Sequence, residues 1–396
     1  MTPPIRGRRR RSVLIVAPQP FYEDRGTPIA VRHVLEALAE LGFELQLLTF
    51  PVGEPVKIDG LETVRCSNPL GIRSVPVGFS LRKVVLDQAL TVTLWRRLRR
   101  GSFACIHAVE EMALPAIVMG RRFGTPVIYD MQSSLPEQLR DHPLLGRLPS
   151  QALLRRAETW MIRNADYVVS STGLAELVLS RSSSGRHRDW VFPGPEFVVK
   201  ATAVDRLRRR LDISSGSPVV LYTGNFEEYQ GVDLLLEAIP GVLRVRPDVV
   251  FLLVGAQDRD HFRLPSLAGV PKAAARVLER QPRDTLAALY ELADVLVSPR
   301  VAGSNVPLKV FDYLANGGVI VATDIAAHRT VLSHDRAVLV APTPEGMADG
   351  ILRVLGEPEL ADQIRASAEA FGEKHLSWDS FVESVRDVYQ TVGAFV

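Results

Sequence analysis

The sequence alternates between short apolar runs of strand length and longer segments with helical spacing, and it does so in two successive series. In the first series, apolar residues recur every three or four positions over 29–41, which is typical of an amphipathic helix. Apolar runs that predict strands lie at 13–17, 43–49, 105–107, 127–129 and 167–170. Strands that alternate with helices predict βαβ units and a mostly parallel sheet.

A second series follows a serine-rich loop at 181–185 and a proline-rich turn at 192–195. Pro240 lies inside its predicted helix 232–245, where we expect a kink or a break because proline removes a backbone hydrogen bond. Two similar halves predict the α/β class, with two doubly wound, Rossmann-like domains facing a central cleft. The strands predicted in this series are 219–222, 249–254, 295–297, 319–321 and 338–340, and helical segments at 345–355 and 381–392 close the chain.

These patterns also predict the domain boundaries. We expect a disordered basic arm over 1–11, an N-terminal domain over 12–195 and a C-terminal domain over 196–380. A final helix over 381–396 could return to the N-terminal domain.

Composition narrows the class of protein. Of the 396 residues, 46% are hydrophobic and 23% are charged, which is typical of a globular chain with enough apolar material for two cores. The net charge of +2 includes five arginines between positions 6 and 11, so the rest of the chain is not basic and a nucleic-acid role is not indicated. Two cysteines exclude a disulfide framework, and no apolar run is long enough to span a membrane, so we expect a cytoplasmic protein.

Each half begins with a strand, a glycine-containing turn and a helix. The first turn contains Gly26, Thr27 and Pro28, and the second contains Gly224 and Asn225. Free N–H groups and the helix dipole favour an anion at such a turn, and two turns facing one cleft suit a diphosphate. Neither turn has the GxGxxG spacing of a nicotinamide site, and glycine turns after strands also occur simply as connections.

The most informative stretch is SPRVAGSNVPLKVFDYLANGGVIVATD, from Ser298 to Asp324. It predicts a strand that ends at Ser298, a turn, and a helix that begins at Pro307 and carries Lys309 and Asp312. This puts another helix N-terminus at the cleft, and the Asp312 carboxylate could bind a ribose diol. The alternative is that Asp312 is an ordinary solvated residue on a helix surface.

This stretch, together with YTGNFEEYQGVDLLLEA, PFYEDRGTPIAVRHVLEALAELGFEL and Leu376-Ser-Trp378, resembles the GT-B-fold, retaining glycosyltransferases of family GT4. The resemblance covers nearly the whole chain, from Val13 to about Val392. It implies a hexosyltransferase that binds a nucleotide sugar on the C-terminal domain and the acceptor on the N-terminal domain, without a metal or another cofactor. The residues that we expect to bind the donor are Gly26, Thr27, Pro28, Gly224, Asn225, Gln230, Gly303, Ser304, Asn305, Val306, Pro307, Leu308 and Asp312.

Several positions depart from the family pattern. Ser304 stands where the first acidic residue is usual, and Asp312 stands for the second, usually Glu. Asn225 and Gln230 occupy the positions of the usual Arg and Lys. Arg300 and Lys309 offer replacement cations, which indicates a variant subgroup. Two alternatives stay open: an inactive scaffold of the same fold, and a nucleotide-sugar epimerase.

The first half supplies further candidates near predicted strand ends. We expect His107 and Asp130 to face the ligand crevice, although a structural histidine is an equal alternative for His107. Gln132, where many family members have histidine, is a third catalytic candidate beside Arg300 and Lys309. The candidates on the acceptor side are Arg25, Glu110 and Glu111. No group of His, Cys, Asp or Glu has metal-ligand spacing, so we expect no metal.

The segment 81–100 predicts a basic amphipathic helix that carries Trp95 and four arginines near its end. Such a helix could lie on an anionic membrane, on the inner face of the cell membrane, and a lipid-linked acceptor would then be plausible. A glycan or a small molecule is the other kind of acceptor. The alternative for the helix is packing on the core with solvated arginines.

Overall fold

The computed structural model describes residues 12–23, 26–76, 80–139, 146–182, 185–194, 201–256, 270–303 and 305–395. The predicted arm at 1–11, Arg25 and Ser304 lie outside the described residues. The chain divides into two compact units. Unit 1 consists of Met1–Val191 and Asp379–Val396, and unit 2 consists of Phe192–Trp378.

Unit 1 is built on a seven-stranded sheet in the order β3-β2-β1-β4-β5-β6-β7, with every pairing parallel. Most of its strands are short and apolar, as expected when helices cover both faces of a parallel sheet. The strands are β1 (Ser12–Val16), β2 (Glu44–Thr49), β3 (Leu61–Arg65), β4 (Cys105–Val109), β5 (Val127–Met131), β6 (Tyr167–Ser171) and β7 (His187–Trp190).

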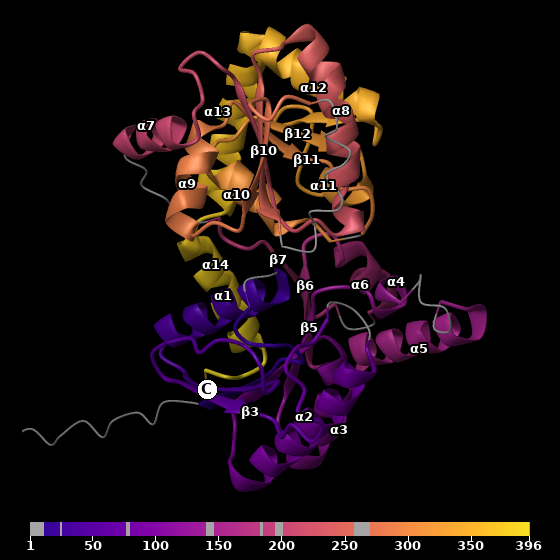
Figure 1. Ribbon diagram of the computed structural model, residues 1–396. Helices are drawn as coiled ribbons and strands as arrows, with labels where there is room; N and C mark the ends of the chain where they lie inside the picture. Colours follow the sequence, from indigo (N-terminus) through magenta and orange to yellow (C-terminus); the bar gives the residue numbers. More distant parts are fainter. Residues whose placement is uncertain are drawn as a thin grey trace, which may run out of the picture. The chain divides into compact units, whose positions relative to one another are not determined.

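Helices lie on both faces of this sheet (Figure 1). On one face, α2 (Leu81–Arg100), α3 (Ala113–Phe123) and α5 (Leu148–Asn164) pack on the apolar core. On the other, α1 (Gly26–Glu40) contacts α14 (Trp378–Thr391) through His33 and Phe381. The short helices are η1 (Glu110–Met112), α4 (Leu135–Gln138) and α6 (Ala175–Arg181). The C-terminal helix is thus part of unit 1 from Asp379 onward.

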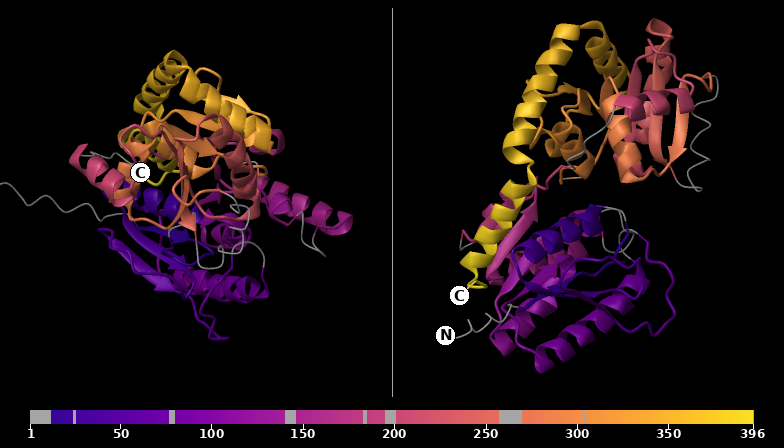
Figure 2. Two further views of the ribbon diagram at one scale, coloured as in Figure 1. Left: turned by 45° about the horizontal axis from the view of Figure 1, so that its top comes forward. Right: turned by 90° about the vertical axis from the view of Figure 1, so that its left-hand side faces the viewer.

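Unit 2 has a six-stranded parallel sheet in the order β10-β9-β8-β11-β12-β13. Helices α8 and α12 cover one face, and α9 and α10 cover the other, where α10 packs against α13 (Figures 1 and 2). The strands are β8 (Val219–Thr223), β9 (Val250–Ala256), β10 (Ala275–Glu279), β11 (Val295–Ser298), β12 (Ile320–Thr323) and β13 (Val338–Val340). The helices are α7 (Ala201–Arg210), η2 (Glu228–Gln230), α8 (Val232–Val245), α9 (Arg283–Leu292), α10 (Leu308–Ala315), α11 (Ala326–Arg329), α12 (Pro344–Gly356) and α13 (Pro358–His375).

Each sheet reverses its strand order at one place. In unit 1 the reversal lies between β1 and β4, and in unit 2 it lies between β8 and β11. The loops that follow the two strands at such a reversal leave the sheet in opposite directions and open a crevice at its carboxyl edge. The two reversals, which we call the switch points of unit 1 and unit 2, are therefore where ligands are expected.

Some local expectations were wrong. The sequence did not predict β3, β7 or β10. Strands β4 and β5 extend to Val109 and Met131, so His107 and Asp130 lie within strands rather than at their ends. Helix α8 continues through Pro240, so of the kink or break expected there the break is absent; apolar residues on both sides of the proline pack on the core.

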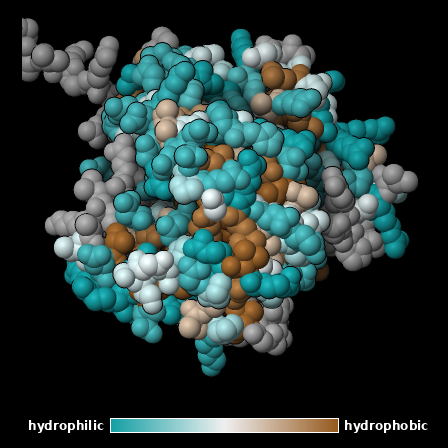
Figure 3. Space-filling model, turned by 90° about the horizontal axis from the view of Figure 1, so that it is seen from above, coloured by the Kyte–Doolittle hydropathy of each residue, from teal (hydrophilic) through white to brown (hydrophobic). Residues whose placement is uncertain are grey.

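The face of the molecule drawn in Figure 3 is mainly hydrophilic, with hydrophobic side chains exposed in smaller areas. Each helix in the described part of the chain is either too short or too polar to span a lipid bilayer.

Candidate active site

The switch point of unit 2 is formed by two loops that are packed closely together. One follows β8 from Gly224 to Gly231, and the other follows β11 from Pro299 to Pro307. Gly231 has a φ of +69°, and a Cβ atom there would lie 2.0 Å from the carbonyl oxygen of Pro299. The backbone of Val301 donates to Tyr229 across the same contact, at 3.1 Å. Because only glycine permits both this φ and this approach, Gly231 fixes the shape of the site.

Lys309 lies in the first turn of α10 and points its amine into the site. The side chain is only 8% exposed, and its Nζ lies 3.9 Å from the centre of the Tyr222 ring. A Cβ atom at Gly224, where φ is +135°, would lie 3.0 Å from Nζ. Among the described residues Nζ has no hydrogen-bond partner. Burial lowers the pKa of Lys309 well below its usual value, and the charge of Arg300 lowers it further.

Arg300 is 5% exposed and shapes the loop after β11. Its Nε donates to the carbonyl of Ala302 at 2.6 Å, and its Nη2 donates to Oδ1 of Asn305 at 2.9 Å. Its guanidinium also lies over the Tyr229 ring, at 5.3 Å. Gly303 has a φ of +106°, which favours glycine, and a Cβ atom there would lie 2.0 Å from Nη2 in its present position. The arrangement fixes a second cation at the same edge of the sheet as Lys309.

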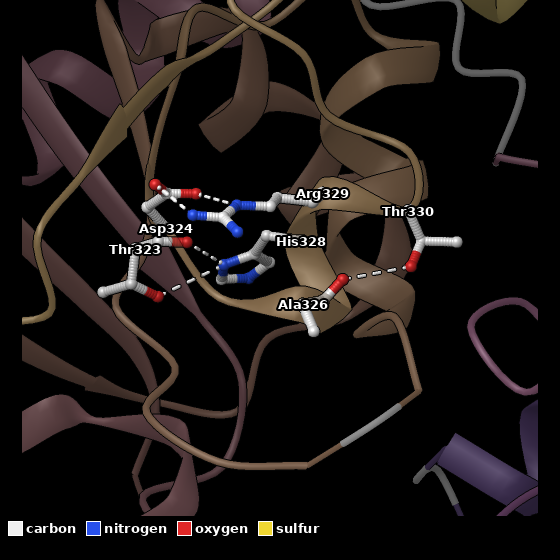
Figure 4. Close-up of polar contacts among 6 residues, drawn as sticks. All are labelled: Thr323, Asp324, Ala326, His328, Arg329 and Thr330. Atoms are coloured by element: carbon white, nitrogen blue, oxygen red, sulfur yellow. Dashed lines mark hydrogen bonds and ion pairs between the residues drawn. The ribbon is translucent and has the colours of Figure 1, made fainter.

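A buried histidine is hydrogen-bonded to the ends of the two strands beside this loop. His328 of α11 points toward the end of β12, where its Nδ1 lies 2.7 Å from the carbonyl of Thr323 (Figure 4). Since a carbonyl only accepts, Nδ1 carries the proton, and Nε2 accepts from Oγ of Ser298 at 2.9 Å. Burial lowers the pKa of His328 to about 4, so the ring is neutral at pH 7. The Thr323 hydroxyl donates to the carbonyl of Arg300, which links this network to the loop.

The sequence reasoning missed this supporting network. Ser298 and Thr323 end neighbouring strands, and His328 follows in the next helix. The sequence signal for this network was a hydroxyl residue at the end of each of the two strands, followed by a histidine five residues after the second. By contrast, the adjacent Arg329 side chain is exposed and pairs with Asp324 at 2.5 Å (Figure 4).

Asp312 lies one turn beyond Lys309 on α10 and is half-buried. The Tyr290 hydroxyl donates to its Oδ2 at 3.4 Å. The next residue, Tyr313, is buried, and its hydroxyl accepts from the backbone N–H of Thr223 at the end of β8, at 3.0 Å. Helix α10 is thus fixed to the strand that forms the switch point, and Asp312 is held beside it.

The remaining unit 2 residues that were predicted to bind the sugar donor are uncharged and form the walls of the site. The Asn225 carbonyl accepts from the Tyr222 hydroxyl at 2.6 Å, and its Oδ1 accepts from the backbone of Glu227 at 3.4 Å. Gln230 is buried in η2, and within the described chain its Oε1 has no partner. Pro307 is the N-cap residue of α10, with Val306 buried before it and Leu308 as the first helical residue.

Three residues predicted in the first half, His107, Asp130 and Gln132, form one hydrogen-bonded group within and directly after the neighbouring strands β4 and β5. His107 is buried, with its Nε2 3.1 Å from Asp130 and its Nδ1 2.9 Å from the Tyr389 hydroxyl. Its ring also stacks on Trp190. The other Asp130 oxygen accepts from Gln132 at 2.6 Å. Since both ring nitrogens are satisfied inside the protein, the geometry favours the structural alternative for His107.

Glu110 directly follows β4 at the switch point of unit 1. Its φ is +52°, which is rare outside glycine, and the short helix η1, which begins at this residue, leads directly into α3. The side chain is 6% exposed, and its Oε1 accepts from the Ser133 hydroxyl at 2.7 Å. Burial raises the pKa of Glu110 to about 8, and the nearby Glu111 adds to the rise. Glu111 itself pairs with Lys83 of α2 at 2.6 Å.

The first turn of α1 contains Gly26, Thr27 and Pro28 and belongs to unit 1. A Cβ atom at Gly26 would meet nothing within 4 Å, so the structure does not require glycine there. Over the described ranges, no three His, Cys, Asp or Glu side chains are grouped so that they could hold a metal ion.

Two family models match the chain. One, described as glycosyl transferase 4-like domain, matches residues 25–191, and the other, described as glycosyl transferases group 1, matches residues 217–357. The chain is also 30% identical over 177 residues to the phosphatidyl-myo-inositol mannosyltransferase of Mycobacterium leprae. That alignment covers 44% of this chain and 46% of the relative, so it spans about half the length of that protein.

Solved structures share the fold. The sucrose-phosphate synthase of Thermosynechococcus elongatus matches with a TM-score of 0.79 at 20% identity, over 98% of this chain and 100% of that one. HepE of Anabaena, solved in complex with UDP, matches with a TM-score of 0.73 at 13% identity, over 96% of this chain and 100% of that one. The fold is therefore that of the GT-B glycosyltransferases. With the two family models, which together span more than half of the chain, the protein belongs to the group 1 glycosyl transferases, family GT4.

Proposed function

We propose that this protein transfers a hexosyl group from a nucleoside-diphosphate sugar to an acceptor hydroxyl, with retention of the anomeric configuration. The observation that carries the proposal is the buried Lys309 amine, which lies without a partner among the described residues in the first turn of α10, at the switch point that Arg300 also borders. A buried cation without a counterion is costly, and a diphosphate would supply the missing charge. The group 1 family and the complex of HepE with UDP support a nucleotide as the source of that diphosphate.

The reaction breaks the bond between the sugar C1 and the diphosphate oxygen, and it forms a bond between C1 and the acceptor oxygen. The diphosphate oxygen keeps the electron pair of the broken bond and gains negative charge, and it takes up the proton that the acceptor hydroxyl releases. Arg300, Lys309 and the first N–H groups of α10 stabilise that charge as it develops, in a site with little water. Asp312, held by Tyr290, accepts hydrogen bonds from the ribose hydroxyls.

We assign the acceptor to unit 1. The described residues near the ends of β4 and β5 include Glu110, Asp130 and Gln132, and the basic Lys83 there is paired with Glu111. Carboxyl and amide groups bind hydroxyls well and offer a phosphate no positive charge. The reacting end of the acceptor is then an uncharged hydroxyl group on a glycan, a lipid-linked molecule or a small molecule. The name of the mycobacterial relative, which acts on a phosphatidyl-inositol, supports the lipid-linked case.

A surface of α2 suits an anionic membrane. Leu86, Leu90, Leu94 and Leu98 are buried on the core, whereas Trp95 is 42% exposed and Arg99 lies over its ring at 4.7 Å. The helix therefore packs on the core and still presents an aromatic and basic surface. The protein is expected to sediment with anionic vesicles at low salt and to be released at high salt. Loss of sedimentation in a variant with Trp95 and the nearby arginines replaced would attribute binding to this surface, and no sedimentation of the unaltered protein would reject it.

The function is tested by incubating the protein with UDP-, GDP- and ADP-sugars and measuring nucleotide release with and without candidate acceptors. Transfer to an acceptor is the expected result. If the protein consumes no donor, the scaffold alternative is correct, and if it converts the sugar without an acceptor, the epimerase alternative is correct. We also propose that the reaction needs no metal, so activity should persist in EDTA. Complete loss that Mg²⁺ or Mn²⁺ restores would contradict this.

A further inference from the structure

The switch point of unit 2 holds two buried basic side chains, Arg300 and Lys309. Arg300 is always charged, because a guanidinium keeps its proton in proteins. If Lys309 were also charged, the free site would hold two buried cations, and among the described residues no carboxylate pairs with Lys309. A buried, unpaired ammonium costs several kcal/mol, which an amine avoids by losing its proton.

The groups around Lys309 come from four elements. Arg300 lies in the loop after β11 and repels a positive charge on Lys309. His328 of α11 is held neutral by its bonds to Ser298 and Thr323. The Tyr222 ring of β8 attracts an ammonium, but such an attraction is worth only about 0.5–2 kcal/mol, less than the cost of burying the charge. Asp312, on α10 itself, accepts from Tyr290. Together these surroundings favour the neutral amine.

We propose that Lys309 is an uncharged amine in the nucleotide-free protein and that it takes up one proton from solvent when a nucleoside-diphosphate sugar binds. This inference rests on the proposed function, because it needs the diphosphate at this site. The diphosphate of a nucleotide sugar carries about two negative charges, which the arginine and the protonated lysine then balance. The proton comes from water or buffer and binds Nζ of Lys309. No covalent bond forms between the ligand and the protein.

The proton uptake is measurable without turnover. UDP-glucose, GDP-mannose and ADP-glucose are titrated calorimetrically into the full chain at neutral pH, in buffers with different enthalpies of ionisation. Nucleotide sugars are suitable probes because their diphosphate does not titrate near pH 7. The dependence of the binding enthalpy on the buffer enthalpy should show uptake of about one proton per nucleotide bound. Affinity should also rise, by up to about tenfold per unit, as the pH falls between the pKa values of the free and the bound amine.

Lys309→Arg is the matched variant, because arginine places a permanent charge at the same position. It should bind the same nucleotide with no proton uptake and a flatter pH dependence. Lys309→Met, which has no titratable group, should also show no uptake. Binding to the unaltered protein without proton uptake, or equal uptake in Lys309→Arg, would overturn the inference and leave the proposed function standing. If none of the three probes binds, the proposed donor class fails and the inference fails with it.

Discussion

The two units use the same strand order at their switch points, but the buried side chains there differ in kind: they are basic in unit 2 and acidic in unit 1. In unit 2 the loop after β11 and the first turn of α10 bring Arg300 and Lys309 to the edge of the sheet. In unit 1 the corresponding edge holds Glu110 and Asp130. The topology therefore fixes where a ligand can bind, and the few residues that follow the central strands fix its charge.

Each switch point is also supported by a neutral or fully bonded histidine. His328 links Ser298 of β11 to Thr323 of β12, and His107 links Asp130 of β5 to Tyr389 of α14. Both histidines are buried and use both ring nitrogens for bonds inside the protein. The comparison suggests that histidines at these edges position loops and neighbouring strands, whereas the charged residues act on the ligands.

The largest expected effect is on turnover, from removal of either cation in unit 2. Arg300→Ala or Lys309→Ala should lower turnover on the order of 10²-fold or more, because each cation acts mainly on charge that develops in the transition state. Steady-state kinetics measures this effect, with the sugar donor that the test with UDP-, GDP- and ADP-sugars identifies. Arg329→Ala is the control, since that arginine follows the neighbouring strand β12, is exposed and pairs with Asp324.

A rescue variant sharpens the same test. Asn225→Arg together with Gln230→Lys restores the usual cations of the family in the neighbouring loop. These changes should partly recover the turnover of Arg300→Ala. Near-normal turnover in both alanine variants would show that unit 2 does not neutralise the diphosphate with these residues. The difference between the basic residues of unit 2 and the acidic residues of unit 1 would then not explain where the donor binds.

A smaller effect is expected from Asp312, the acidic residue in the otherwise cationic site. Asp312→Asn keeps the size of the side chain but removes the charged acceptor, so nucleotide affinity should fall about tenfold, consistent with the loss of one charge-assisted hydrogen bond. The unaltered protein should prefer UDP to 2′-deoxy-UDP, and the variant should lose most of this preference. Calorimetry measures both. Asp248→Asn, before β9 and so at the opposite edge of the sheet, is the control. If the variant still preferred UDP to 2′-deoxy-UDP as strongly as the unaltered protein, Asp312 would not contact the ribose.

The sequence predicted the two-domain α/β fold because short apolar runs and helical spacing are local signals. It did not predict β3 or β10, whose side chains are mostly only partly buried and give a weak apolar pattern. For the candidate site, the stretch from Ser298 to Asp324 located Arg300 and Lys309 correctly at one sheet edge. It could not give the burial of Lys309 beside Tyr222 or the support from His328, since both depend on which strands become neighbours.

The last expected effect is on stability, where the two units should respond to pH in opposite directions. Burial raises the pKa of Glu110 to about 8 in unit 1, and burial with the charge of Glu111 raises that of Asp87. Both carboxyls hold protons in the folded state that the unfolded chain releases. Unit 1 should therefore lose stability as the pH rises from about 4.5 through 8, by up to about 1.4 kcal/mol per pH unit for each group.

In unit 2, burial lowers the pKa of His328 to about 4 and lowers that of Lys309. Here the unfolded chain binds more protons, so unit 2 should lose stability as the pH falls below about 10.5 through the lowered pKa of Lys309, and again as it falls from about 6.5 through 4 for His328. Hydrogen exchange of peptides from β4 and from β11, compared between pH 5 and pH 8 after correction for the intrinsic rate, measures each unit separately. Glu110→Gln should flatten the response of unit 1 and leave that of unit 2 unchanged. If both units responded in the same direction, the buried charges at the two switch points would not be as different as their side chains indicate.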